Sequence, residues 1–166
     1  MQHPAEKHHV KGSARLLHLC LANSAIMVAE VFDEISLALA LTRDAKQSVL
    51  LYPDAIGLPT APEFVMQANS AVRLVILDAS WRHSRQMLLK NPLLQNLPRY
   101  ALRAVPASRY QIRQAHGADQ LSTLEACTYA LMQLEAESTK FAALLHAFDA
   151  FNEMQIQFGV NNLLRP

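Results

Sequence analysis

The apolar positions along the chain alternate between short continuous runs and longer segments with helical spacing. Three short runs predict strands: residues 24–32 (SAIMVAEVF), 48–53 (SVLLYP) and 72–78 (VRLVILD). Near-continuous apolar runs are typical of parallel strands that are buried on both faces. Shorter strands are predicted at residues 100–105 and 109–113. The alternation predicts an α/β fold, with a mostly parallel sheet flanked by helices.

Helical spacing predicts helices over residues 13–22, 33–44, 82–90, 122–137 and 139–158. Ser13 and Asp33 are residue types that favour the N-cap, and Asn91 and Pro92 should end the third helix. An almost continuous apolar stripe in the last helix predicts that it packs on the core through Phe141, Leu144, Leu145, Phe148, Phe151 and Phe158, with Gln155 as the polar exception.

The length and composition predict a single globular domain over residues 1–166. With 166 residues, 51% of them hydrophobic and 17% charged, the chain can bury a substantial core. Cys20 and Cys127 lie in apolar helical contexts without metal-site spacing, which predicts buried thiols in a reducing compartment. The chain shows neither an apolar leader nor an apolar run of roughly 18 residues, so we expect a cytoplasmic protein with no membrane partner.

Charge is distributed unevenly along the chain, although the formal net charge is only +1. Residues 79–118 contain no Asp or Glu, and we call this stretch the basic block. Its cations are Arg82, Arg85, Lys90, Arg99, Arg103, Arg109 and Arg113. Such a block predicts a polyanionic partner. The alternative is chance clustering of cations on a solvated face.

Several kinds of site are disfavoured by the residues present. The four glycines are far apart, so the chain has neither a Gly-rich dinucleotide fingerprint nor a P-loop, and a nucleotide-like cofactor would have to be held in another way. The seven histidines lack supporting cysteines or paired carboxylates, so no metal site is predicted. A G-x-S-x-G nucleophile elbow is also absent.

The segment LDASW, residues 77–81, combines a strand end with a helix start. Asp78 ends the strongest predicted strand, and ligands of open α/β sheets bind outside the carboxyl ends of the strands. An alternative interpretation makes Asp78 or Ser80 the N-cap of the following helix. Trp81, the only tryptophan, can equally be a core residue.

Two further segments allow both a structural and a functional interpretation. In LSTLEA, residues 121–126, Ser122 and Glu125 form a capping box, while the same helix start can face a ligand. In SRYQIR, residues 108–113, a strand would place Arg109 and Arg113 on one face, where they can clamp a carboxylate or phosphate. The alternative there is an exposed strand with solvated arginines.

Six segments in the same order resemble the DTW domain family: QHPAE (2–6), GSARLL (12–17), LLYP (50–53), LDASW (77–81), SRYQIR (108–113) and LSTLEA (121–126). The resemblance implies a SPOUT-like knotted α/β domain that binds S-adenosylmethionine without a Gly-rich loop. It also implies a tRNA-uridine aminocarboxypropyltransferase, which moves the 3-amino-3-carboxypropyl group of S-adenosylmethionine to N3 of a tRNA uridine in the variable loop and releases methylthioadenosine.

The resemblance also implies roles for individual residues. Asp78 would be the base, or would hold the sulfonium, with Ser80 orienting it and Trp81 packing on the cofactor. Further cofactor contacts would come from Leu51, Tyr52, Pro53, Tyr110, Arg113, Leu121, Ser122, Thr123 and Glu125. The tRNA would be bound by Arg82, Arg85, Lys90 and Arg109.

Two departures from the family pattern are visible. Ser80 stands where the signature has threonine, which keeps the hydroxyl group. Many relatives carry an N-terminal cysteine-rich segment, and this chain begins at about the point where that segment ends, as a naturally short member or a trimmed one would. The alternatives to the implied activity are a SPOUT-like methyltransferase, a relative acting on ribosomal RNA, and a non-catalytic RNA-binding module.

Overall fold

The computed structural model describes residues 1–9, 12–53, 57–62, 64–66, 70–110 and 121–163. The chain forms two compact units. The sheet unit consists of Met1–His8 and Ile26–Arg103, and the helical unit of His9–Ala25 and Ala104–Pro166. Each unit is therefore built from two separate stretches of the sequence.

The sheet unit contains a three-stranded parallel sheet in the order β2-β1-β3. Its strands are β1 (Gln47–Leu51), β2 (Val72–Ile76) and β3 (Arg99–Tyr100). Val49 and Leu50 point to opposite faces of β1 and are both fully buried. The predicted parallel strands around residues 48–53 and 72–78 are thus confirmed, because their continuous apolar runs fill both faces.

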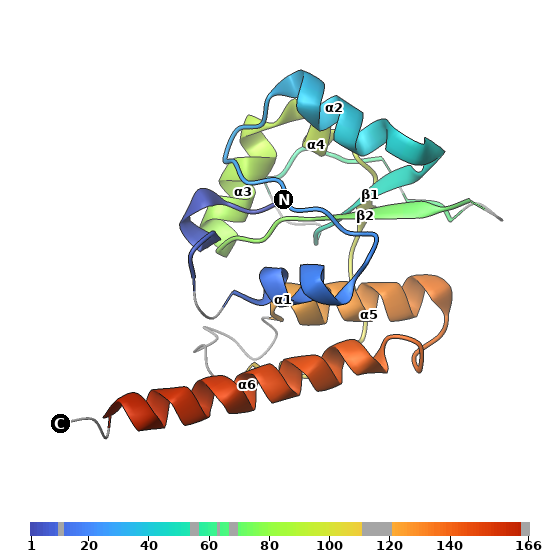
Figure 1. The fold of residues 1–166 in the computed structure, drawn as a ribbon. Coiled ribbons are helices and arrows are strands. Elements are labelled where there is room, and N and C mark those ends of the chain that lie inside the picture. Colours follow the sequence, from blue (N-terminus) through green and yellow to red (C-terminus); the bar gives the residue numbers. More distant parts are fainter. Residues whose placement is uncertain (10–11, 54–56, 63, 67–69, 111–120, 164–166) are drawn as a thin grey trace. The chain divides into compact units, whose positions relative to one another are not determined.

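Three helices pack on one face of this sheet: α2 (Glu34–Thr42), α3 (Trp81–Lys90) and α4 (Pro92–Gln95) (Figure 1). The short 3-10 turns η1 (Pro4–Glu6) and η2 (Arg43–Ala45) complete the unit. One core cluster joins helices and strands, through Phe32, Leu37, Leu41, Leu50, Tyr52, Val75, Leu77, Met87, Leu88 and Leu94. This shared core orients the first turn of α3 against the strand ends.

Residues 24–32 do not form the predicted strand. Only Val28 makes a bridge, to Gln2. The backbone nearby is satisfied instead by the buried side chain of Asn91, whose Oδ1 accepts from the Phe32 N–H (2.8 Å) and whose Nδ2 donates to the Glu30 carbonyl (2.9 Å). Apolar residues of this stretch pack on the core without a full strand partner, which is why their pattern resembled that of a strand.

The strand predicted at residues 100–105 is wrong beyond its first residue, because β3 covers only Arg99–Tyr100. Ala104 adopts a φ of 48°, in the left-handed region, which no strand can include. Arg109 and Tyr110 are not in a strand, and residues 111–113 of that prediction lie outside the described residues.

The predicted end of α3 before Pro92 is confirmed, and Pro92 begins α4 as its first residue.

The helical unit consists of α1 (Ser13–Cys20), α5 (Thr123–Glu135) and α6 (Ala142–Leu163), which contact one another pairwise (Figure 1). Ser13 is the first helical residue and Gly12 the N-cap, so the predicted Ser13 cap is wrong. The Ser13 hydroxyl instead accepts a hydrogen bond from the Leu124 N–H at 3.3 Å, which joins α1 to the first turn of α5. The Asp33 cap of α2 is confirmed by a bond from the Ser36 N–H.

The apolar stripe of α6 is buried only in its first half. Leu144, Leu145 and Phe148 are buried, as is Phe141 directly before the helix, whereas Phe158 is 60% exposed. The prediction of a helix packed along its whole length is therefore wrong for the last turns. Among the described residues, no helix is long and apolar enough to span a membrane.

The two cysteines differ in their surroundings. Cys127 is buried in α5, as predicted, but Cys20 at the end of α1 is exposed, so that half of the prediction is wrong. Burial raises the pKa of the Cys127 thiol to about 12. Cys127 is therefore an unreactive core thiol, and Cys20 is the accessible one.

Candidate functional site at the carboxyl edge of the sheet

Asp78 lies two residues beyond β2, at the carboxyl edge of the sheet. Its peptide is bonded by the segment Met1–His3: its N–H donates to the Met1 carbonyl (2.8 Å) and its carbonyl accepts from the His3 N–H (3.0 Å). Asp78 is only 8% exposed, and Oδ2 accepts a hydrogen bond from Nε2 of Gln2 at 2.8 Å. A buried, oriented carboxylate therefore stands where open α/β sheets bind their ligands.

The helix after Asp78 is capped by Ser80. The Ser80 hydroxyl accepts a hydrogen bond from the His83 N–H at 3.3 Å. The interpretation of Asp78 as the cap is wrong, because its carboxylate is bonded to Gln2 and Ser80 occupies the N-cap position. The cap thus fixes the start of α3 without using the carboxylate.

Trp81 is exposed at the first turn of α3, with 54% of its surface accessible, so the core interpretation is wrong. Its ring lies edge-on to the ring of Tyr52, with centroids 5.9 Å apart and planes at 74°. The Tyr52 hydroxyl is hydrogen-bonded to Ser84 (3.0 Å), and the Ser84 hydroxyl donates to the Trp81 carbonyl (3.0 Å). These contacts lock the end of β1 to α3 and leave an aromatic face open to a ligand.

The other strand ends add aromatic groups to this edge. Leu51 and Tyr52 are buried and Pro53 is exposed, and the Tyr52 N–H donates to the Tyr100 carbonyl at 3.1 Å. Burial raises the pKa of the Tyr100 phenol, an effect that Arg103 partly opposes. Tyr100 therefore keeps its proton at neutral pH and remains a hydrogen-bond donor.

A stacked pair of histidines borders Asp78 and was missed by the sequence analysis. The rings of His3 and His83 lie 4.1 Å apart with planes at 9°. They meet because the segment Met1–His3 pairs with Asp78, a long-range contact that leaves no local signal. Among the described residues, no group of three His, Cys, Asp or Glu side chains could hold a metal ion.

In the helical unit, the capping box of α5 is confirmed, and Glu125 does more than close it. The Glu125 carboxylate is fully buried and accepts from the Ser122 N–H (2.8 Å), the Ser108 hydroxyl (2.9 Å) and the Arg109 N–H (2.5 Å). Two of the six segments that resemble the family thus meet on one carboxylate. Leu121 and Thr123, on either side of Ser122, are half-buried.

The side chains of Arg109 and Tyr110 pack within the helical unit. Arg109 forms an ion pair with Asp149 (2.7 Å), and the Tyr110 ring packs on Phe148 with centroids 5.2 Å apart. Arg109 is therefore partly neutralised at a site predicted to contact tRNA. The second arginine of that prediction, Arg113, lies outside the described residues.

The basic block is divided between the two units. In the sheet unit, Arg82 is exposed, Arg85 donates to the Gly57 carbonyl (3.0 Å), and Lys90 is paired with Glu30 (2.7 Å). The hydrogen bond from Lys90 lowers the pKa of Glu30. Lys90 is thus paired with an acid, whereas Arg82 and Arg85 form no ion pair with any of the described residues. Of the three RNA-binding residues predicted on α3, the two arginines therefore have the positive charge that is available to a phosphate.

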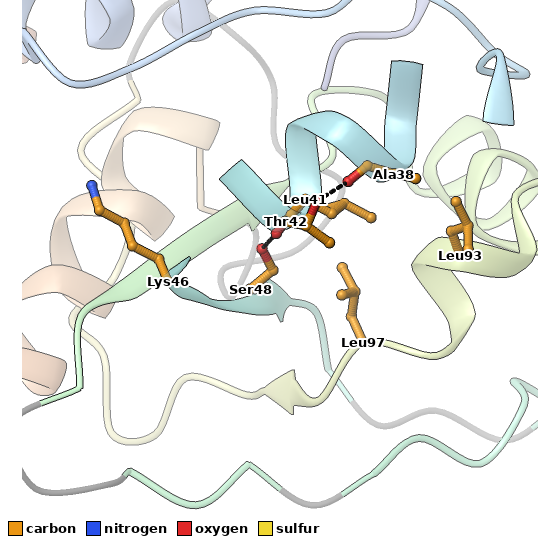
Figure 2. Close-up of a pocket in the computed structure, with 7 residues that line it drawn as sticks. All are labelled: Ala38, Leu41, Thr42, Lys46, Ser48, Leu93 and Leu97. Carbon is orange, nitrogen blue, oxygen red and sulfur yellow. Dashed lines mark hydrogen bonds between the residues drawn. The ribbon is translucent and has the colours of Figure 1, made fainter. Parts of the chain in front are cut away.

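A hollow of about 470 Å³ lies at the opposite edge of the sheet, near the amino end of β1 (Figure 2). Leucines from α2 and from the region of α4 line it. The hydroxyls of Thr42 and Ser48 bind the carbonyls of Ala38 (2.9 Å) and Leu41 (2.5 Å), as Figure 2 shows. Its two hydroxyl groups are thus already bonded to carbonyls of α2, and Asp78 is not among the residues that line the hollow.

The chain matches the model of the DTW domain over residues 1–156. It is 28% identical over 163 residues to tRNA-uridine aminocarboxypropyltransferase 2 of Macaca fascicularis and 29% identical over 163 residues to the protein of the same name from Mus musculus. Each alignment covers 96% of this chain and 54% of the relative, so the chain spans about half the length of these curated relatives. No solved structure matches the chain significantly. With the family model covering nearly all of the sequence, the chain belongs to the DTW domain family.

Proposed function

We propose that this chain transfers the 3-amino-3-carboxypropyl group of S-adenosylmethionine to N3 of a tRNA uridine in the variable loop, in the cytoplasm. The observation that carries the proposal is the buried Asp78 carboxylate, three residues before the exposed Trp81, in a member of the DTW domain family. The names of the relatives support the reaction class. We further propose that the chain is a single SPOUT-like domain with a knotted backbone.

The proposed reaction forms one bond and breaks one bond at the same carbon. Uridine N3 attacks the carbon of the aminocarboxypropyl chain that is bonded to sulfur. The C–S bond breaks, its electron pair stays on sulfur, and neutral methylthioadenosine leaves. The N3 proton must pass to a base before or during this attack. The selection of this carbon over the methyl group follows from the pose of the donor, because only a carbon in line with N3 reacts.

Asp78 is the proposed base, with Ser80 orienting it and Trp81 packing on the donor. A carboxylate at this position can instead stabilise the sulfonium by its charge alone. Both roles use the same geometry, a fixed carboxylate at the strand end beside an exposed indole. They differ in whether Asp78 carries a proton after transfer.

The proposed donor pocket in the sheet unit includes the chain at Leu51, Tyr52 and Pro53, where β1 ends beside Trp81. For the helical unit, the cofactor contacts of Tyr110, Leu121, Ser122, Thr123 and Glu125 stay predictions. Arg82, Arg85 and Lys90 are the proposed tRNA contacts of α3, and Arg109 that of the helical unit. Lys90 has to exchange Glu30 for a phosphate, so its contribution should be the smallest of the three on α3.

The test is incubation of the purified chain with an unmodified tRNA transcript and S-adenosylmethionine labelled either in the methyl group or in the carboxyl group. Nucleosides and small-molecule products are then identified by mass spectrometry. We expect the carboxyl label in the tRNA and the methyl label in methylthioadenosine, in equal amounts. Asp78→Asn is assayed in the same way and should lose the transfer. Its matched control is Asp44→Asn, because Asp44 is an exposed acid of the same unit, paired with Arg43.

Each other outcome identifies an alternative. Methyl label in the RNA, together with S-adenosylhomocysteine, would make the chain a methyltransferase. Transfer to a ribosomal RNA transcript but not to tRNA would identify a ribosomal RNA enzyme. Binding of tRNA without either product would indicate a non-catalytic RNA-binding module.

A further inference from the structure

Gln2 makes a buried side-chain contact with the proposed catalytic carboxylate. The glutamine is 6% exposed and Asp78 is 8% exposed. The Nε2 atom of Gln2 lies 2.8 Å from Oδ2 of Asp78, a good hydrogen-bond distance. A hydrogen bond between two groups this well shielded from water is strong, and its loss would leave a buried charge short of a donor.

The backbone fixes Gln2 from both sides. Its N–H donates to the Met27 carbonyl (2.8 Å), and its carbonyl accepts from the Ala29 N–H (3.2 Å). On the other side, Gln2 forms a parallel bridge to Asp78, made by the peptides of Met1 and His3. Residues that face each other across such a bridge point their side chains to the same face of the sheet. The amide is thus held opposite the carboxylate by four backbone hydrogen bonds.

The next residue ties the same segment to α3. His3 stacks on His83, which is in the first turn of the helix that follows Asp78. The segment Met1–His3 consequently contacts both the carboxylate and the helix start. A shift of this segment would move both parts of the site together.

We propose that Gln2 is a positioning residue that orients the Asp78 carboxylate, an inference that rests on the proposed function. An amide donor carries no charge, so it fixes the orientation of Oδ2 and favours the anion without neutralising it. An arginine or lysine at this place would instead hold the carboxylate in an ion pair and weaken it as a proton acceptor. The proposal holds for either role of Asp78, because both need an oriented anion.

The test compares Gln2→Leu, which keeps the approximate side-chain size and removes the donor, with Gln95→Leu. Gln95 also donates one side-chain hydrogen bond, to the Leu89 carbonyl (2.9 Å), but near the far end of α3. We expect kcat for transfer to fall roughly ten- to a hundredfold in Gln2→Leu, with a smaller change in KM for S-adenosylmethionine. Gln95→Leu should keep the wild-type kcat.

A double-mutant cycle separates positioning from general destabilisation. If Gln2 acts through Asp78, Gln2→Leu should not lower the residual activity of Asp78→Asn any further. An equal fall in both backgrounds would overturn the proposal, as would an unchanged kcat in Gln2→Leu when the wild-type chain is active. An inactive wild-type chain would instead contradict the proposed function.

A second readout does not depend on activity. The carboxylate carbon of Asp78 can be followed by carbon-13 NMR, at one fixed pH, in Gln2→Leu, Gln95→Leu and the wild-type chain. We expect its chemical shift to change in Gln2→Leu alone, because only this variant removes the hydrogen bond to Oδ2. An unchanged chemical shift would refute the role of Gln2, whatever the transfer assay gives.

Discussion

Asp78 and Trp81 are only three residues apart, yet one is buried and the other is exposed. Burial makes the carboxylate sensitive to each hydrogen bond that it accepts, and exposure leaves the indole able to contact a ligand. The turn between β2 and α3 separates the two side chains, and the distant segment Met1–His3 is hydrogen-bonded to Asp78. Because Trp81 is the only tryptophan, its fluorescence reports directly on this turn.

Asp78→Asn should separate the two roles proposed for this residue. If Asp78 is the base, we expect transfer to slow by about two to four orders of magnitude. Binding of S-adenosylmethionine, followed by Trp81 fluorescence, should change little, and Asp44→Asn should behave as wild type in both assays. Loss of binding together with transfer would favour the sulfonium-holding role, and near-normal transfer would rule out the base.

The two thiols should differ in their reaction with alkylating reagents. Cys20 is exposed, whereas burial raises the pKa of Cys127 to about 12 and keeps it a protonated thiol at neutral pH. We expect iodoacetamide to label one site in the native chain and two in urea, with peptide mass spectrometry locating the first at Cys20. Rapid native labelling of Cys127 would contradict this packing of α5.

At the level of elements, short polar contacts decide where helices begin and what they hold. Ser80 is the N-cap of α3, and Ser122 is the N-cap of α5. Glu125 extends the second cap into a junction, because three donors from two chain segments converge on its carboxylate. The capping box is thus a tertiary contact as well as a local one.

Variants of this junction should differ in their cost to stability. Ser122→Ala should lower the free energy of unfolding by about 1 kcal/mol, the typical value of an N-cap. Glu125→Ala should cost more, because the buried N–H of Ser122 and the partly buried N–H of Arg109 lose their acceptor. Urea unfolding measures both, with the exposed Ser138→Ala as a control that should change little. Equal costs for the two variants would show that the bonds to Ser108 and Arg109 contribute nothing.

For the whole molecule, the charge pattern matters more than the net charge of +1. The basic block begins at the proposed catalytic turn and continues into α3. Its exposed cations suit an interaction with phosphates, which is electrostatic and releases counterions.

Binding of tRNA should therefore weaken steeply as salt increases. We expect Arg82→Gln to lower the affinity and to reduce the slope of log K against log salt by about one. Arg43→Gln removes the same charge from an exposed arginine that is paired with Asp44 and precedes β1, and it should leave the slope unchanged. An affinity that barely depends on salt would contradict the RNA-binding assignment of α3.

Local physics was enough to predict much of this protein. The parallel strands β1 and β2 follow from apolar runs long enough to fill both faces of a sheet. The caps Asp33 and Ser122 follow from the hydrogen-bonding reach of short polar side chains, and Pro92 had to end α3 because its ring cannot continue a helix. The sequence by itself also placed Asp78 at a strand end.

The tertiary structure alone decided how those residues are used. The apolar pattern of residues 24–32 could not distinguish them from a strand, because the Asn91 side chain that satisfies their backbone comes from a distant part of the chain. The exposure of Trp81, the stack of His3 on His83, and the bond from Gln2 to Asp78 likewise depend on long-range packing. Sequence spacing determines which side chains are neighbours along an element, but contacts between segments far apart in the chain depend on the folded backbone. The surroundings of the Asp78 carboxylate are set by such contacts between distant segments.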